Sequence, residues 1–262
     1  MITVNGCIVN CTQFPDGTSS MRCENYGSGK NIIEWKFDGD HECIIIWHLV
    51  HHIRAHDPET CIFLFLPYIP NARMDRVKAC DEVFTLKWFA EFINALNFTK
   101  VFVEDPHSNV SAALIDRVDI KGVGANVRAT INLIGANKDE VLFCYPDEGA
   151  TKKYSDQIKG EYVFGIKHRD WRTGNIQKFE LVGADKVRGR TVLIVDDICS
   201  RGGTFMHTAK ALKEAGAGKV FLYITHCENT IFNGELLSSD LIEHIYTTDS
   251  IYRGCHKKIT VL

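Results

Sequence analysis

Short apolar runs of strand length recur along this chain, and most of them are followed by a segment with helical periodicity. The clearest runs, at residues 61–66 and 191–195, are almost continuously apolar. Such a run is typical of a strand that is buried on both faces, in a parallel sheet with helices on either side. The alternation of strands and helices therefore predicts an α/β fold with mainly parallel sheets flanked by helices.

The remaining elements are predicted from periodicity, glycines and capping residues. Further strands are expected over residues 2–11, 32–37, 101–103, 141–145 and 220–225. We expect Asp40 to cap a helix that ends before Pro58 and carries Ile44, Trp47, Val50 and Ile53. We expect Thr85 to cap a helix that buries Leu86, Phe89, Ala90, Ile93 and Leu96. A third helix is expected over residues 204–215, ending at Gly216 and Gly218.

Length and composition indicate a globular protein. At about 150 residues per domain, the 262 residues are consistent with two domains or with one large one, and the best boundary gives domains of 1–122 and 123–262. A net charge of −3 gives no reason to expect nucleic acid or an anionic membrane as a partner. No membrane span or signal peptide is evident. Ten scattered cysteines without a CxxC pair favour reduced thiols and a cytoplasmic location.

The strongest candidate site follows the apolar strand at 191–195. Asp196 and Asp197 come next, and Gly202, Gly203 and Thr204 open the following helix. Backbone N–H groups of such a loop converge at the helix N-terminus, where the helix dipole favours an anion. Acids at the carboxyl end of a parallel strand lie where ligands bind and can accept hydrogen bonds from a sugar. The pattern predicts a phosphate site; a strand–turn–helix corner with solvated acids is the alternative.

A second candidate site follows the strand at 61–66. Two prolines frame a turn, after which Arg73 and Arg76 stand on either side of Asp75. Arginine stays charged and suits bidentate contact with phosphate. By residue type alone, a phosphate site and a surface turn with an ion pair are equally consistent with this segment.

These two motifs, together with four weaker ones, resemble motifs of the ribose-phosphate diphosphokinase family, the phosphoribosyl-diphosphate synthetases, and they follow one another along the chain in the same order as in that family. The segment 192–205 resembles a sugar-phosphate loop that type I phosphoribosyltransferases share, whereas 66–76 resembles an ATP-site element that they lack. Four weaker matches are Phe14-Pro15-Asp16-Gly17-Thr18, Asp105-Pro106-His107, residues 145–149 and residues 166–169. The resemblance implies two phosphoribosyltransferase-type domains, of which the first binds ATP and the second the ribose phosphate.

The resemblance also implies roles for particular residues. ATP is expected to contact Phe14, Asp16, Thr18, Arg73, Met74, Arg76 and His107. The ribose phosphate is expected on Asp196, Asp197, Ser200, Arg201, Gly202, Gly203 and Thr204. Catalysis is assigned to Lys167 and Arg169 on a mobile loop over 167–179, and Mg²⁺, the expected cofactor, to His107 and Asp147. A homo-oligomer, dimer or hexamer, is also implied.

The implied reaction transfers the β,γ-diphosphate of ATP to the anomeric hydroxyl of ribose 5-phosphate, which gives phosphoribosyl diphosphate and AMP. Three departures bear on the substrate: Met74 replaces a glutamine, Thr18 a glutamate, and Ser200-Arg201 an Asp-Thr pair. Because Arg201 could meet a second phosphate, the same chemistry on ADP-ribose, for NAD resynthesis, is the alternative.

Two other functional classes remain. A phosphoribosyltransferase would not need the ATP-site element at 73–76, and a non-catalytic regulatory homologue would not need Lys167, Arg169, His107, Asp147 and Asp196. One histidine cluster is not explained by any of these functions. His48, His51, His52 and His56 have a near-helical spacing that can bind a transition metal. No acidic or cysteine partner joins them, so an exposed helix face or a subunit contact is the preferred interpretation.

Overall fold

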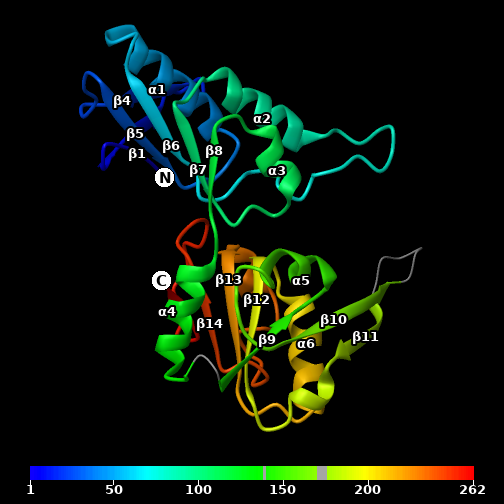
Figure 1. The fold of residues 1–262 in the computed structure, drawn as a ribbon. Coiled ribbons are helices and arrows are strands. Elements are labelled where there is room, and N and C mark those ends of the chain that lie inside the picture. The colour runs from blue at the N-terminus through cyan, green and yellow to red at the C-terminus, as the bar shows by residue number, and fades with distance from the viewer. Residues whose placement is uncertain (138–139, 170–175) are drawn as a thin grey trace. The chain divides into compact units, whose positions relative to one another are not determined.

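The computed structural model describes residues 1–137, 140–169 and 176–262, without the side chains of 167–169 and 176–178. It divides into two compact units, Met1–Lys121 and Gly122–Leu262, each with its own hydrophobic core (Figure 1). Each unit is an α/β structure with a mainly parallel sheet flanked by helices, which confirms the predicted fold class. None of the helices in these described ranges is both long and apolar enough to cross a membrane.

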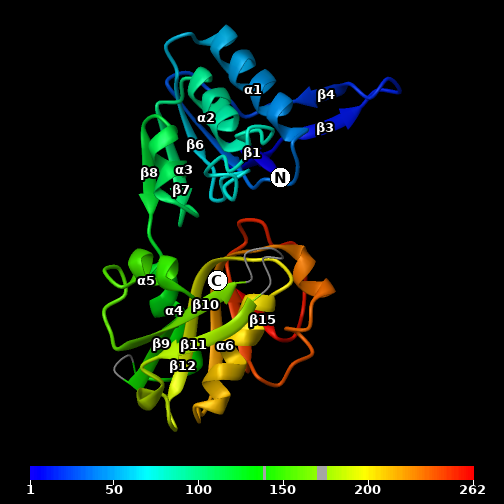
Figure 2. The same ribbon diagram turned by 90° about the vertical axis from the view of Figure 1, so that its right-hand side faces the viewer.

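Unit 1, Met1–Lys121, contains a six-stranded sheet in the order β2-β1-β5-β6-β7-β8. The strands are β1 (Ile2–Val4), β2 (Cys7–Ile8), β5 (Lys30–Trp35), β6 (Cys61–Phe65), β7 (Lys100–Glu104) and β8 (Val118–Lys121). The last four are parallel, and β1 and β2 pair antiparallel at one edge. A separate antiparallel hairpin of β3 (Asn10–Gln13) and β4 (Ser19–Arg22) projects from this unit (Figure 2).

Helices α1 (Glu42–His56) and α2 (Thr85–Ala95) share one core cluster with alternate residues of the parallel strands, and α3 (Asn109–Leu114) follows β7. Successive side chains of a strand point to opposite faces, so this alternation defines the covered face of the sheet. The strand residues of the cluster include Ile33, Trp35, Ile62, Leu64, Val101 and Val103.

Unit 2, Gly122–Leu262, contains a seven-stranded sheet in the order β11-β10-β9-β12-β13-β14-β15. The strands are β9 (Val141–Tyr145), β10 (Tyr162–Arg169), β11 (Ile176–Val182), β12 (Thr191–Cys199), β13 (Val220–Cys227), β14 (His244–Thr247) and β15 (Ile259–Val261). All neighbours are parallel except β10 and β11, which form an antiparallel hairpin.

Helices cover both faces of this second sheet. The side chains of α4 (Gly124–Ile134) and α5 (Glu148–Tyr154) form a cluster with Leu193 and Val195 of β12. Those of α6 (Gly203–Glu214) form another with Val192 and Ile194. The apolar run at 191–195 is therefore buried on both faces, as predicted. Two short 3₁₀ helices, η2 (Ala184–Lys186) and η3 (Asn229–Asn233), complete the unit's described elements.

Several local predictions were wrong. Residues 2–11 do not form one strand, because Asn5 and Gly6 both have positive φ, 48° and 81°, and turn the chain between β1 and β2. Asp40 and Thr85 are not caps: α1 begins after His41, and α2 begins at Thr85 itself.

Of the four apolar residues expected on α1, Val50 and Ile53 are buried, whereas Ile44 and Trp47 are 49% and 38% exposed. The other buried residues of α1 are Glu42, Ile45, Ile46 and Leu49. Apolar residues at 44–47 and 49–50 leave two overlapping stripes on this helix, so periodicity alone could not select the one that packs against the sheet.

Candidate functional site

The candidate ribose-phosphate loop connects β12 to α6 at the carboxyl edge of the unit 2 sheet. Strand β12 continues through Asp196 and Asp197 to Cys199, because its pairing with β13 continues as far as Cys199 and Cys227. The acids therefore lie within the strand, not after it. Gly202, with φ of 82°, occupies the N-cap position of α6. The N–H groups of the first turn of α6 thus lie at the edge where parallel sheets bind ligands.

The two acids of β12 have different surroundings. Asp197 is only 6% exposed, and its Oδ2 lies 3.0 Å from Nζ of Lys153 on α5. Asp196 is half-buried, and its Oδ1 accepts a hydrogen bond of 3.0 Å from the backbone N–H of Asp197. Asp196 is therefore the more accessible carboxylate of the pair, whereas Asp197 is held by an ion pair that the sequence did not predict.

On one side, this loop packs against the segment that follows β13, residues 228–234. Ser200 Oγ lies 3.0 Å from Thr230 Oγ1, and the backbone N–H of Glu228 donates to the Cys199 carbonyl oxygen at 2.8 Å. A Cβ atom on Gly234 would lie 1.9 Å from the Arg201 carbonyl oxygen. The backbone of the loop is thus packed tightly on this side, while the Arg201 side chain is exposed.

Asp147 lies at the same edge of the sheet, after β9. It is the N-cap of α5, where its Oδ1 accepts a hydrogen bond of 3.0 Å from the Ala150 N–H. This bond fixes the orientation of the carboxylate.

Lys167 and Arg169 lie near the carboxyl end of β10, where their backbones pair with Phe179 and Ile176 of β11. Both ends of the predicted loop over 167–179 therefore belong to the paired strands β10 and β11. Residues 170–175 and the side chains of Lys167 and Arg169 lie outside the described residues. Because β10, β9 and β12 are adjacent parallel strands, the predicted residues of unit 2 all lie along one sheet edge (Figure 1).

The candidate ATP residues of unit 1 fall into two places, of which the first is the carboxyl edge of its sheet. Arg73, Met74 and Arg76 follow β6, and His107 follows the adjacent strand β7. The Glu104 N–H donates to the Pro67 carbonyl oxygen at 3.0 Å, which joins the two strand ends. Arg73 and Arg76 are exposed, and Nε of Arg76 lies 3.0 Å from Asp75 Oδ1.

The second place is the tip of the β3–β4 hairpin. Phe14 is 55% exposed there, and Asp16 Oδ1 accepts hydrogen bonds from the backbone N–H and the hydroxyl of Thr18, at 2.9 and 2.7 Å. These bonds, the backbone one above all, hold the pKa of Asp16 below its ordinary value. The hydrogen bonds of Phe14, Asp16 and Thr18 described here lie within the tip of this hairpin.

The two predicted metal residues belong to different units. His107 lies in unit 1 and Asp147 in unit 2. Within the described residues, no group of three or more His, Cys, Asp or Glu side chains is arranged to hold a metal ion. The histidines of α1 are exposed, and the rings of His52 and His56 contact each other and Tyr26, with centroids 4.8 to 5.0 Å apart.

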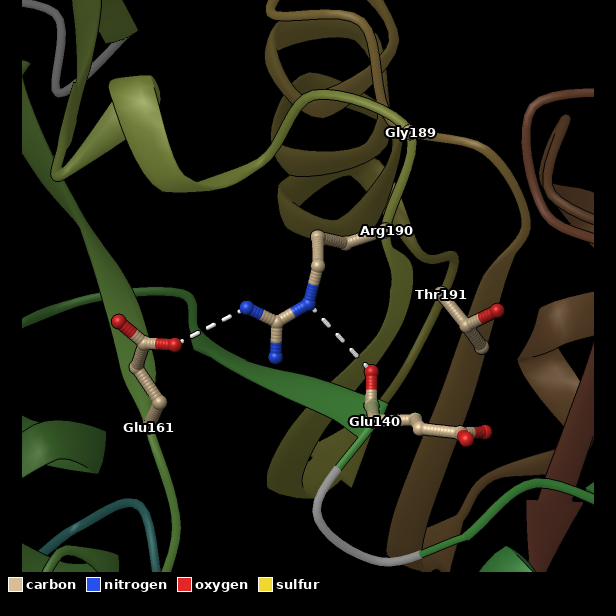
Figure 3. Close-up of a pocket in the computed structure, with 5 residues that line it drawn as sticks. All are labelled: Glu140, Glu161, Gly189, Arg190 and Thr191. Carbon is tan, nitrogen blue, oxygen red and sulfur yellow. Dashed lines mark hydrogen bonds and ion pairs between the residues drawn. The ribbon is translucent and has the colours of Figure 1, made fainter.

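A pocket in unit 2 lies at the opposite edge of the sheet from the predicted site, at the amino ends of β9, β10 and β12. Figure 3 shows Arg190 extending between Glu161 and Glu140, with Nη1 3.0 Å from Glu161 Oε2 and Nε 3.4 Å from the Glu140 carbonyl oxygen. Hydrogen bonds from Arg190 and Lys186 lower the pKa of Glu161. Arg190 and Glu161 form an ion pair in this pocket, and no predicted site residue lines it.

Comparison with known proteins identifies relatives along most of the chain. A family profile described as "Phosphoribosyl synthetase-associated domain" matches residues 174–261. The ribose-phosphate pyrophosphokinase of Marinomonas sp. (strain MWYL1) is 29% identical over 199 residues, which are 73% of this chain and 61% of that protein. The ribose-phosphate pyrophosphokinase of Bacillus subtilis (strain 168) is 27% identical over 257 residues, 95% of this chain and 78% of that protein.

A solved structure has a similar fold over nearly the whole chain. The crystal structure of phosphoribosylpyrophosphate synthetase from Mycobacterium smegmatis matches with a TM-score of 0.74 and 19% identity, covering 97% of this chain and 85% of that one. The chain therefore has the two-sheet α/β fold of that synthetase. Over most of its length the chain is similar to ribose-phosphate pyrophosphokinases. It spans about 60% of the length of several curated relatives, 61% and 59% for those of Marinomonas and Shewanella oneidensis.

Proposed function

We propose that this protein transfers the β,γ-diphosphate of ATP to the anomeric hydroxyl of a ribose phosphate and releases AMP. The observation that best supports this proposal is the convergence of Asp147, the end of β10 and the acid–glycine loop of β12 along one sheet edge. Ribose 5-phosphate is the acceptor that the family implies, and phosphoribosyl diphosphate is then the product. The protein would act as a homo-oligomer in the cytoplasm.

In this proposal the residues of unit 2 bind the acceptor and stabilise the transition state. Asp196 accepts hydrogen bonds from ribose hydroxyls, and the N–H groups of Gly203 and Thr204 bind the phosphate. Lys167 and Arg169 neutralise negative charge that develops on the transferred phosphoryl oxygens. Diphosphoryl transfer needs little covalent chemistry from the protein, so positioning and cationic groups supply most of the rate acceleration.

In unit 1, the proposal assigns the ATP phosphates to Arg73 and Arg76, whose exposed guanidinium groups suit them, with Met74 beside them. The adenine is assigned to Phe14, Asp16 and Thr18. Mg²⁺, when bound, would neutralise phosphate charge. It prefers oxygen ligands and takes few of them from a protein. The proposal assigns it to the capping carboxylate of Asp147 and to His107.

ADP-ribose is a second candidate acceptor, and one observation favours it. The Arg201 side chain is exposed at the loop that is proposed to bind the phosphate. An arginine at this position can contact the second phosphate of a diphosphate bridge. Product would then be ADP-ribose diphosphate, which serves NAD resynthesis.

The proposed reaction is tested by incubating the protein with ATP, Mg²⁺ and each acceptor in parallel and quantifying AMP by chromatography. We expect AMP to form only when a ribose phosphate acceptor is present. Formation of ADP instead of AMP, or no acceptor-dependent turnover with either sugar, would contradict the proposal.

A further inference from the structure

A chain of hydrogen bonds runs behind the candidate ribose-phosphate loop, through Ser200, Thr230 and Glu228. Ser200 Oγ and Thr230 Oγ1 are 3.0 Å apart, and Thr230 Oγ1 lies 3.0 Å from Glu228 Oε2. All three side chains are half-buried. Because the Glu228 N–H also donates to the Cys199 carbonyl oxygen at 2.8 Å, the chain is anchored to the loop by backbone.

The direction of these hydrogen bonds follows from the number of protons. A carboxylate only accepts, and each hydroxyl has one proton to donate. Thr230 donates its proton to Glu228, so it can only accept from Ser200. Ser200 therefore donates its one proton to Thr230, and its oxygen has only lone pairs left for a ligand in the loop.

A phosphate group is a poor partner for a hydroxyl oriented in this way, because phosphate oxygens are themselves acceptors. The mismatch increases with the charge of the phosphate, since the Glu228 carboxylate lies only two hydrogen bonds away. A phosphomonoester carries about −1.5 to −2 charges at neutral pH, whereas a phosphorus with a second ester or anhydride bond carries one.

We propose that Glu228 and Thr230 are specificity-determining residues, which orient Ser200 so that the loop disfavours a dianionic phosphomonoester. The preferred acceptor is then a ribose phosphate whose phosphorus carries a second ester or anhydride bond. This inference rests on the proposed function, which assigns the acceptor phosphate to this loop. Gly234 packs closely on the Arg201 carbonyl, which leaves the backbone next to Ser200 little room to move toward this segment.

The test compares the dissociation constants of the whole protein for ribose 5-phosphate and ADP-ribose. Thr230→Val preserves side-chain shape but releases the Ser200 proton, and Glu228→Gln removes the charge and can donate to Thr230. In each variant, the affinity for ribose 5-phosphate relative to that for ADP-ribose should rise by about 10-fold or more, because a hydrogen bond to a charged group is worth that much. Thr230→Ser, which keeps the chain of bonds, should leave the ratio unchanged.

Ser238→Ala is a matched control: this hydroxyl lies further along the same segment, exposed, and donates to the Glu235 carbonyl oxygen. A ratio within about twofold of wild type in both Thr230→Val and Glu228→Gln would overturn the inference. A general loss of folding is recognised because it lowers both affinities together, whereas the inference predicts a higher affinity for ribose 5-phosphate.

Assays of AMP formation with the same proteins separate the two proposals. A shifted binding ratio without any acceptor-dependent AMP would overturn diphosphoryl transfer and support the selectivity of the loop. AMP formation with an unshifted ratio would overturn the selectivity and support the reaction.

Discussion

Lys167 lies near the carboxyl end of β10, at the same sheet edge as Asp147 and Asp196, and we propose that it acts mainly in the transition state. Lys167→Ala should therefore reduce turnover by roughly 10²- to 10³-fold, the usual effect of removing one group that stabilises developing charge, while ATP affinity stays nearly constant. Single-turnover rates and ATP binding measure the two effects. Lys210→Ala, at an exposed position of α6, is the control. A normal rate for Lys167→Ala would remove Lys167 from the mechanism.

His107 follows β7 at the edge where the exposed arginines after β6 also lie. If it binds the metal–ATP complex, His107→Ala should raise the Mg²⁺ concentration needed for half-maximal activity and weaken ATP binding. Mg²⁺ titrations at fixed ATP compare the two proteins, with the exposed His207→Ala on α6 as a control. Superimposable curves for His107→Ala and wild type would show that His107 is only a turn residue.

Arg201 is the residue whose replacement best separates the two candidate acceptors. If it contacts a second phosphate, that contact is worth about 1.5–3 kcal/mol, or roughly 10- to 150-fold in affinity. Arg201→Thr should then shift the ratio of kcat/KM for ADP-ribose and ribose 5-phosphate toward ribose 5-phosphate by this factor. A wild type that does not use ADP-ribose, with a ratio unaffected by the mutation, would exclude this role.

At the scale of elements, the loop between β12 and α6 depends on the segment that closes its back. Gly234→Ala would place a Cβ atom against the Arg201 carbonyl oxygen, so the backbone must shift. We expect a loss of about 1–3 kcal/mol in the free energy of unfolding, as for other overpacked sites, together with weaker acceptor binding. Urea unfolding measures the change. Gly27→Ala, where a Cβ meets nothing within 4 Å, should be nearly neutral, and equal effects for the two would contradict this account.

Some of these elements could be predicted from the sequence and others could not. Strands buried on two faces, such as β12, could be predicted because a short, continuous apolar run fits few structures other than a strand inside a parallel sheet. The turn between β1 and β2 was missed because the apolar residues around it suggested one long strand, although Asn-Gly is a strong hairpin signal. The partners of Asp197 and Ser200 could not be predicted from the sequence. Lys153 lies 44 residues from Asp197 and Thr230 lies 30 residues from Ser200, and only tertiary packing brings them close.

At the scale of the whole molecule, the two units have separate cores. Every buried residue of the first cluster lies within 1–121, and every residue of the other two lies within 122–262. We therefore expect residues 122–262, expressed alone, to fold, with cooperative thermal unfolding and a structured near-ultraviolet circular dichroism spectrum. A fragment that lacks a cooperative transition would show that unit 2 depends on unit 1 for its stability.

The central claim is that both the β- and the γ-phosphate of ATP move to the acceptor in one transfer. Incubation of the full chain and Mg²⁺ with a ribose phosphate acceptor and ATP labelled with ³²P at the β or, separately, at the γ position tests it directly. The account predicts that each label appears in the sugar product and that AMP is unlabelled. Transfer of the γ label alone, with the β label retained in ADP, would contradict it.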